Sequence, residues 1–427
     1  MVLALHPGVL FAMAAALFLI LHLSLHWPLP IAFIAVAVAT ALAGDFGFPY
    51  RHLVEGGFGF LNLILALFAG AFFGHMMKQS QFAEAAANGM VRAAGGSVFL
   101  VLTLIGLPIF IVGMFVGLSG VAVLAAGVFA VPAMRRVGFE DATIAAFIAV
   151  MATAGMIAPP MNVPAMLLAD GVNMPWTGAT RPLLAISVPV AVSALVWFTW
   201  GQGPKRAAQD AQLDAPVSFA TALGGLAPFA LMVAIWLSVR LFPDQVVDPA
   251  SPLILVIGGL VAVPFVKRDK LREAVLATFT GTPLVLAAAL VAIGVFVQIM
   301  TLTGVRGWVV ITTMSLVAPW IYPGLLIGMP LVGGALTSMV VADVMGVPAA
   351  FSFMGQNMII NVAALSGISA LAEFIPPTSI AAALACYVVG GGSIGQVFRR
   401  SWPPLLVLAA ISVLMLVFAR QLSGIIT

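Results

Sequence analysis

The sequence predicts an all-α polytopic membrane protein with two related halves, and three observations lead to this fold class. Hydrophobic residues make up 63% of the 427-residue chain and charged residues only 7%, against about 25% charged in soluble domains. The mean hydropathy is +1.19. Apolar runs close to the ~20 residues that cross a bilayer as a helix recur along the chain. One stretch of the first half also returns, in altered form, in the second half.

The first half contains six apolar runs that we expect to span the membrane. They lie near Val9–Leu25, Pro28–Gly44, Phe58–Met77, Val98–Val116, Ala142–Leu168 and Leu183–Trp200. The next stretch, Gly201–Val217, is the least apolar of the chain and includes Lys205 and Asp210. We interpret it as a linker between the two halves.

The second half offers six further runs, so we expect eleven or twelve spans in all. They lie near Ala222–Leu241, Leu253–Val266, Leu284–Leu302, Trp308–Leu331, Phe351–Phe374 and Leu405–Phe418. Two polar stretches, Lys78–Gly95 and Lys267–Ala277, are predicted to be helices lying in the plane of the membrane interface. The second has four basic residues in six, which favours the cytoplasmic side.

An internal repeat connects the halves. Val116–Pro132 (VGLSGVAVLAAGVFAVP) and Val332–Pro348 (VGGALTSMVVADVMGVP) share six of seventeen residues at an offset of 216. One residue of slippage later, Pro159-Pro160 aligns with Pro376-Pro377. An apolar run, a turn with glycine, a basic residue and Pro-Leu-Leu follow each pair. The order and spacing of these features indicate a true repeat.

Each Pro-Pro pair is predicted to break a helix within the membrane. Proline lacks an amide hydrogen and clashes with the preceding turn. The break leaves carbonyls and amides without partners, which costs several kcal/mol each at membrane depth. Carbonyls suit Na⁺ and helix N-termini suit carboxylates. The two breaks therefore indicate a site for an ion or an anionic substrate, although kinks satisfied by neighbouring helices would leave the same pattern.

The glycine-rich segments of the repeat, Val116–Pro132 and Val332–Pro348, are predicted to form re-entrant hairpins. Ser119 and Gly120 mark the first tip, and Thr337 and Ser338 mark the second. Hydroxyl groups at these tips can coordinate a cation or donate to a carboxylate. Small residues also allow close helix packing, which is the alternative interpretation.

Two acids lie within apolar runs of the second half, Asp343 and Glu373. A charged side chain at the bilayer centre costs about 2.5–3.5 kcal/mol on insertion scales. Either acid could bind Na⁺ or carry a proton, and either could instead lie near a helix end in water. Amides near the breaks, Asn162, Asn357 and Asn361, are weaker candidates.

Several classes of function lack support in the sequence. No Walker A, H-E-x-x-H, G-x-S-x-G or C-x-x-C motif occurs, and the five histidines show no metal-ligand spacing. Basic residues lie in short loops and tyrosine is scarce, which argues against nucleic-acid binding. An intramembrane enzyme using Asp343 and Glu373 as an acid pair stays open, but no matching acid exists in the first half. A passive channel also stays open, although two discontinuous repeats favour alternating access.

The repeated motifs resemble one family, the large membrane subunits of tripartite ATP-independent periplasmic (TRAP) transporters. The resemblance extends from about Ile31 to Leu416. It is carried by the hairpin start Leu118-Ser119-Gly120-Val121-Ala122, the basic turn Val131-Pro132-Ala133-Met134-Arg135-Arg136, the break Gly155-Met156-Ile157-Ala158-Pro159-Pro160, and the second-half segments Phe374-Ile375-Pro376-Pro377-Thr378-Ser379, Gly395-Gln396-Val397 and Arg399-Arg400.

This resemblance implies an elevator-type transporter of the bacterial inner membrane with two inverted repeats, no cofactor, and Na⁺ as coupling ion. Its substrate would be a small organic anion, usually a carboxylate. Its partners would be a small four-helix membrane subunit and a periplasmic substrate-binding protein. The implied Na⁺ sites lie near Ser119, Gly120, Thr337 and Ser338. The full set of candidate ion- and substrate-binding residues is Ser119, Gly120, Thr153, Gly155, Pro159, Pro160, Asn162, Thr337, Ser338, Asp343, Gly367, Pro376, Pro377 and Thr378.

The sequence departs from the family pattern at three places. Val121 stands where the family has a second serine, Met161 replaces the serine after the first Pro-Pro, and the second hairpin has an acid only at Asp343. A standalone Na⁺- or H⁺-coupled carboxylate transporter of the same superfamily is the alternative. The expected boundaries are 1–200 for the first half (scaffold 1–96, hairpin and broken helix 97–182), 201–217 for the linker, and 218–427 for the second half (scaffold 218–304, hairpin and broken helix 305–400, last helix 401–420).

Overall fold

The computed structural model describes residues 5–175, 178–201, 219–315 and 318–426, and every regular element in these ranges is helical. Seven of the described helices are long and apolar enough to cross a membrane. The predicted fold class, an all-α polytopic membrane protein, is confirmed. The predicted linker lies outside the described residues, except for Gly201.

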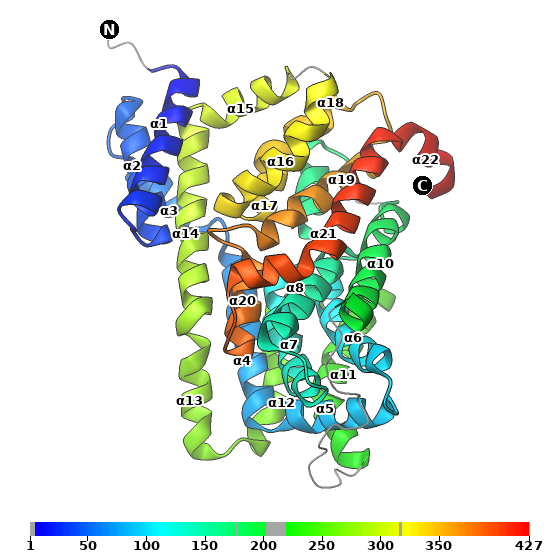
Figure 1. Ribbon diagram of the computed structural model, residues 1–427. Helices are drawn as coiled ribbons and strands as arrows, with labels where there is room; N and C mark the ends of the chain where they lie inside the picture. Colours follow the sequence, from blue (N-terminus) through cyan, green and yellow to red (C-terminus); the bar gives the residue numbers. More distant parts are fainter. Residues whose placement is uncertain (1–4, 176–177, 202–218, 316–317, 427) are drawn as a thin grey trace.

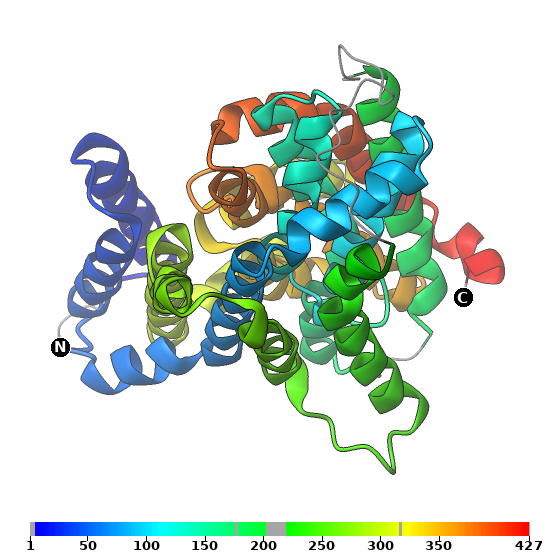
Figure 2. The same ribbon diagram turned by 90° about the horizontal axis from the view of Figure 1, so that it is seen from below.

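The N-terminal helices form a group of their own beside a long column (Figure 1). The group consists of α1 (Pro7–Leu19, extended by a π-helical turn, Ile20–Ser24), α2 (Leu29–Ala43) and α3 (Tyr50–Phe58). The column consists of α13 (Arg268–Thr278) and α14 (Gly281–Leu302), which follow one another nearly in line. Because α14 packs on α2 and α3 at one side and on α4 and α20 at the other, it separates the group from the rest of the molecule (Figure 2).

The first half continues with one crosswise helix, one hairpin and one broken helix. Its helices are α4 (Leu61–Gln79), α5 (Phe82–Ala93), α6 (Val98–Val116), α7 (Ser119–Arg136), α8 (Asp141–Ile157), α9 (Val163–Gly171) and α10 (Thr180–Val196, extended by Trp197–Gly201). Helices α6 and α7 form the first hairpin. Helices α8 and α9 are the two parts of the first broken helix, separated by residues 158–162.

The second half also contains a hairpin followed by a broken helix. Its helices are α11 (Phe219–Leu241), α12 (Ala250–Ala262, extended by Val263–Phe265), α13, α14, α15 (Val305–Met314), α16 (Ala318–Leu336), α17 (Ser338–Val341, continued by a π-helical turn, Ala342–Gly346), α18 (Val347–Ser352), α19 (Met358–Ala370, continued by a 3₁₀ turn, Leu371–Phe374), α20 (Ile380–Val389), α21 (Ile394–Val417) and α22 (Ala419–Ile426). Helices α16 to α18 form the second hairpin. Helices α19 and α20 are the parts of the second broken helix.

Three expectations about the elements were wrong. The predicted span Trp308–Leu331 is divided between α15 and α16. The segments Val116–Pro132 and Val332–Pro348 are not complete hairpins, because the first begins at its tip and the second begins near the end of α16, so each supplies mainly the returning arm. Helix α13 does not lie across the molecule as α5 does, because it packs along α4 and extends the column of α14.

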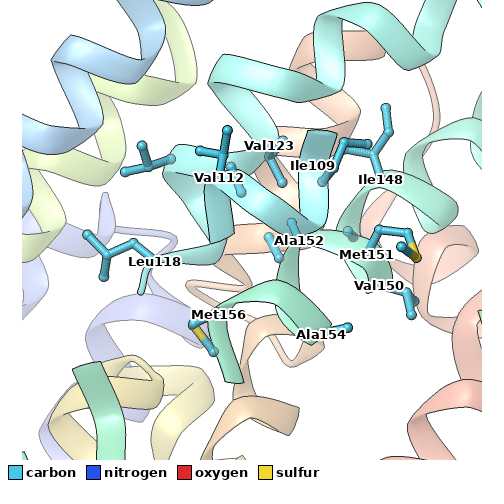
Figure 3. Close-up of a cluster of buried hydrophobic side chains, with 14 of the residues drawn as sticks. Ile109, Val112, Leu118, Val123, Ile148, Val150, Met151, Ala152, Ala154 and Met156 are labelled. Atoms are coloured by element: carbon cyan, nitrogen blue, oxygen red, sulfur yellow. The ribbon is translucent and has the colours of Figure 1, made fainter. Parts of the chain in front are cut away.

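The main core lies where the first hairpin meets the first broken helix. Ile109 and Val112 of α6 and Val123 of α7 pack with Ile148 and Met151 of α8 (Figure 3). All but Met151, which is 3% exposed, are completely buried. A lipid-facing helix would not bury its side chains in this way. Helix α8 is instead enclosed by protein, which places the break after it in the interior.

Glycines allow the hairpins to approach the broken helices at equivalent positions. A Cβ added to Gly155 of α8 would lie 2.4 Å from the carbonyl oxygen of Phe110 in α6. A Cβ added to Gly333 of α16 would lie 2.6 Å from the Cβ of Ala372, which follows α19. Gly113, the counterpart of Gly333, meets Gly155 itself. This pairing supports the predicted repeat. It offsets the first arms of the two hairpins by 220 residues, because Gly113 corresponds to Gly333, whereas the identical residues gave an offset of 216.

Candidate functional site

At each hairpin tip, only one or two non-helical residues separate the two helical arms. Gly117 ends α6 with φ +71° and Leu118 then leads into α7, whose first residue is Ser119. Thr337 separates α16 from α17 with φ +101°, and Ser338 is the first residue of α17. A positive φ is unusual for a threonine and marks a strained turn. The two serines therefore occupy the same position in their hairpins, the start of the returning arm.

The Pro-Pro loops bind the hairpin tips through their backbone. The amide of Met161, just after the first pair, donates to the carbonyl oxygen of Met114 at 3.2 Å. In the second half the amide of Thr378 donates to the carbonyl oxygen of Gly334 at 2.9 Å, and its hydroxyl group donates to the same oxygen at 2.9 Å. Both Pro-Pro bonds are cis. Each break thus finds part of its hydrogen bonding in the adjacent hairpin.

The side chain of Glu373 lies where the two tips meet. It is 2% exposed and comes from the 3₁₀ turn just before the second Pro-Pro pair. Ser119 donates its hydroxyl hydrogen to Oε2 at 2.5 Å, and Ser338 donates to Oε1 at 2.5 Å. The backbone amide of Ala381 in α20 also donates to Oε2, at 3.1 Å. One carboxylate therefore joins both hairpins to both parts of the second broken helix.

A small cavity lies beside this carboxylate, with a volume of about 30 Å³. Ser119 and Glu373 supply polar groups to its wall, together with the backbone of Gly120. The remaining lining residues are apolar: Leu63, Leu67, Leu118, Val121, Met156, Leu290, Met339 and Ile380. A cavity of this size holds one small ion or a water molecule.

Among the described residues, no positive side chain balances the charge of Glu373. Among the described residues it makes no ion pair, and none of the residues lining the cavity is basic. His75 of α4 and Tyr387 of α20, on helices that reach the cavity, instead contact each other at 3.4 Å and do not line it. The N-termini of α7 and α20 face the carboxylate and favour negative charge there.

Asn162 organises the first break. It is 1% exposed, and its Oδ1 accepts from the amide of Ala165, which caps the start of α9. Its Nδ2 donates to the carbonyl oxygen of Ile157 at 3.0 Å and to the hydroxyl oxygen of Ser366 at 3.1 Å. Because Ser366 belongs to α19, this amide connects the two broken helices.

Other candidate residues lie in helix contacts rather than beside Glu373. The hydroxyl of Thr153 donates to Ala149 within α8, and Gly155 packs against α6. A Cβ at Gly367 would lie 2.3 Å from the hydroxyl oxygen of Ser412 in α21. Asp343 lies in the second hairpin and pairs with Arg306 of α15 at 2.7 Å. The structure thus brings Ser119, Gly120 and Ser338 together, with Thr337 adjoining Ser338.

A second polar cluster lies against the first tip, on α11. The guanidinium of Arg240 contacts the Met161 sulfur at 3.1 Å. One turn earlier on α11, Trp236 stacks on Phe115 with ring centroids 5.2 Å apart. The indole Nε1 of Trp236 is buried and has no hydrogen-bond partner among the described residues. Arg240 likewise makes no ion pair with any described residue.

A comparison of the sequence with models of known families finds a match, which includes part of the site described above. Residues 3–202, slightly less than half of the chain, match the model of the family described as "Tripartite ATP-independent periplasmic transporter, DctM component". This part of the chain is similar to the DctM family. The match covers the first hairpin and the first Pro-Pro break, and it confirms the resemblance to TRAP large subunits that those motifs predicted. The chain is thus a multi-pass membrane protein with the sequence features of a transporter component.

Two further comparisons complete the picture. The crystal structure of the YdaH transporter of Alcanivorax borkumensis is similar at 17% sequence identity and a TM-score of 0.49, covering 97% of this chain and 98% of that one. Neither value is high enough to assign a function. The comparison with curated proteins gave no match.

Proposed function

We propose that this chain is the permease subunit of a secondary transporter that imports a small organic anion across the bacterial inner membrane, driven by a Na⁺ gradient. The single observation that carries the proposal is the meeting of two hairpin tips at a buried carboxylate beside a broken helix. Alternating access needs an ion site that elements from both repeats can close. Elevator motion of the hairpins and broken helices against the scaffold is part of this proposal.

The cation part of the proposal rests on the donor atoms at the tips. The hydroxyl oxygens of Ser119 and Ser338 keep free lone pairs while their hydrogens point to Glu373. Oxygen atoms of this kind, together with unwound backbone carbonyls, are ligands for Na⁺. The residues present at the tips therefore fit a small monovalent cation.

The anion part rests on the cluster of α11. Arg240 provides a fixed positive charge, and Trp236 provides a buried N–H donor without a partner among the described residues. A guanidinium binds a carboxylate with two parallel hydrogen bonds. Met161, which Arg240 contacts, also meets the first tip, since its carbonyl oxygen would lie 2.4 Å from a Cβ at Gly117. An anion bound to Arg240 would thus lie next to the hairpin that holds Ser119.

The DctM match supports a tripartite assembly with a small four-helix membrane subunit and a periplasmic binding protein. Helix α2 presents an apolar face, with Ile31 54% exposed and Leu42 53% exposed. Lipid covers such a face as well as a partner does. Co-purification of a small membrane protein would favour the tripartite assembly, and transport by the purified chain alone would favour the standalone alternative.

The described contacts give no support to Asp343 and Glu373 as the acid pair of an intramembrane enzyme. Asp343 is paired with Arg306, whereas Glu373 binds Ser119 and Ser338. Among the described residues, no hydrogen bond joins the two acids. An acid pair is therefore not formed.

Uptake into proteoliposomes tests the proposed function. We expect radiolabelled small mono- and dicarboxylates, such as lactate and succinate, to accumulate when an inward NaCl gradient is imposed, with the binding protein added where the co-purified complex is used. Replacing NaCl by choline chloride should remove the accumulation. The proposal would be refuted if no anion were taken up faster than by protein-free liposomes. It would also be refuted if uptake were the same with and without the cation gradient.

A further inference from the structure

Each carboxylate oxygen of Glu373 holds one hairpin. Oε2 accepts from Ser119 of the first hairpin, and Oε1 accepts from Ser338 of the second. The two serines belong to opposite halves of the chain, and within the described part of the chain neither has another side-chain hydrogen bond to the second broken helix. Moving either hairpin away from the second broken helix therefore breaks one of these hydrogen bonds and opens the carboxylate to water.

The closed arrangement leaves a charge that requires compensation. An ionised carboxylate taken out of water without an opposite charge costs several kcal/mol, even with hydrogen bonds. Three donors and two helix N-termini offset part of this cost. No described basic residue contributes, and the helices that line the cavity, from α4 to α20, bring no other titratable side chain to its wall.

A cation that neutralises Glu373 would have space to bind. The cavity of about 30 Å³ adjoins both Glu373 and Ser119, which is room for one small ion. A proton would bind on the carboxylate itself and need no cavity. Both ligands share one chemistry, since each is a monovalent cation that neutralises Glu373.

We propose that Glu373 is a latch that holds both hairpins closed only when one monovalent cation, Na⁺ or H⁺, neutralises its carboxylate. This inference rests on the transport function proposed above and assigns the coupling step to a single residue. With the cation bound, closing both serines onto Glu373 buries a neutral site. Without it, closure buries a bare charge, so an empty carrier keeps one hairpin open.

Thermal melting of the full-length purified chain tests this latch without knowledge of the substrate. The probes are NaCl titrated against choline chloride at constant ionic strength, and pH titrated in choline chloride alone. We expect the wild-type melting temperature to rise saturably with NaCl if Na⁺ is the ligand, or with falling pH if H⁺ is the ligand. Glu373→Gln removes the charge while its amide can still bind both serines. Its melting temperature should therefore lose the NaCl response, or show a smaller pH response than the wild type, in which other paired carboxylates also titrate.

Matched variants make the test specific. Glu273→Gln, an exposed acid on α13, should keep the full wild-type response. A Glu373→Gln protein that retains the wild-type cation response would overturn the proposal, as would a wild type that responds to neither cation.

The serine variants decide the question if Glu373→Gln does not fold. Ser119→Ala and Ser338→Ala each remove one donor, and if Na⁺ is the ligand we expect each to weaken its apparent affinity by about tenfold, the usual effect of losing a group that orients a ligand. If H⁺ is the ligand, each change should instead shift the pH response upward, because the lost donor stabilised the ionised carboxylate. Ser369→Ala, a buried serine of α19 whose hydroxyl bonds within its own helix, is the control. Unchanged affinity in both tip variants would overturn the latch.

The two proposals can fail separately. A cation-dependent melting temperature that Glu373→Gln abolishes, in a protein that takes up no organic anion, would leave the latch in place and refute the transport of organic anions. Cation-driven uptake that Glu373→Gln leaves unchanged would refute the latch alone.

Discussion

Replacing Arg240 with alanine is expected to raise the anion concentration that half-saturates uptake by about ten- to a hundredfold. A hydrogen bond to a charged group contributes about 1.5–3 kcal/mol, and Arg240 is the guanidinium that contacts the first Pro-Pro loop at Met161. Arg240→Lys should recover only part of the loss, because an ammonium cannot form the two parallel bonds of a guanidinium. The measurement is initial uptake rate against substrate concentration in proteoliposomes.

Arg268→Ala provides the matched control, since this arginine lies at the start of α13, away from both tips. It should leave uptake unchanged. Arg240 lies in the last turn of α11, where a positive charge also favours the helix dipole. If Arg240→Ala lowered only the melting temperature and left half-saturation unchanged, this structural role would explain the residue and the anion site would lie elsewhere.

Replacing Gly155 with alanine is expected to destabilise the chain by about 1–3 kcal/mol, the usual cost of overpacking a dense interior. The added Cβ would lie 2.4 Å from the Phe110 carbonyl oxygen and 2.9 Å from its Cα, both backbone atoms that cannot rotate away. Helices α6 and α8 would have to separate. Because α8 leads directly into the first break, we also expect reduced uptake. The measurements are melting temperature and the yield of monodisperse protein.

Gly307→Ala on α15 is the control, because no atom lies within 4 Å of the position of its Cβ. Alanine is favoured over glycine in a helix by up to about 1 kcal/mol, so this variant should be as stable as the wild type or slightly more so. A Gly155→Ala protein that melts at the wild-type temperature would mean that α6 and α8 do not pack as closely as described.

The sequence was sufficient to locate the tips but not the group between them. Ser119, Gly120, Thr337 and Ser338 could be found because a small-residue segment next to a repeated Pro-Pro pair has few other uses. Glu373 was recognised as an acid in an apolar run, yet its burial depends on helices from both halves. Proximity across more than 250 residues, as between Ser119 and Glu373, leaves no local pattern in a single sequence.

The errors have a similar physical origin. The offset of 216 was taken from identical residues, whereas the close contacts of Gly113 and Gly333 give 220. Basic residues in Lys267–Ala277 predicted a helix in the interface plane, but packing along α4 aligns it with α14 instead. Arg240 and Trp236 carried no signal, because one arginine near a helix end is common. Only their tertiary contacts identify Arg240 and Trp236 as candidate anion-binding residues.

Charge movement in a bilayer tests the central claim most directly, namely that a monovalent cation binds where the hairpin tips meet Glu373. Proteoliposomes adsorbed on a solid-supported membrane would be switched from choline chloride to NaCl at constant ionic strength, without substrate. The account predicts a transient inward displacement of charge that saturates with Na⁺ in the wild type and disappears in Glu373→Gln. A wild-type signal no larger than that of protein-free liposomes, after a Na⁺ jump and after an acid jump alike, would contradict it.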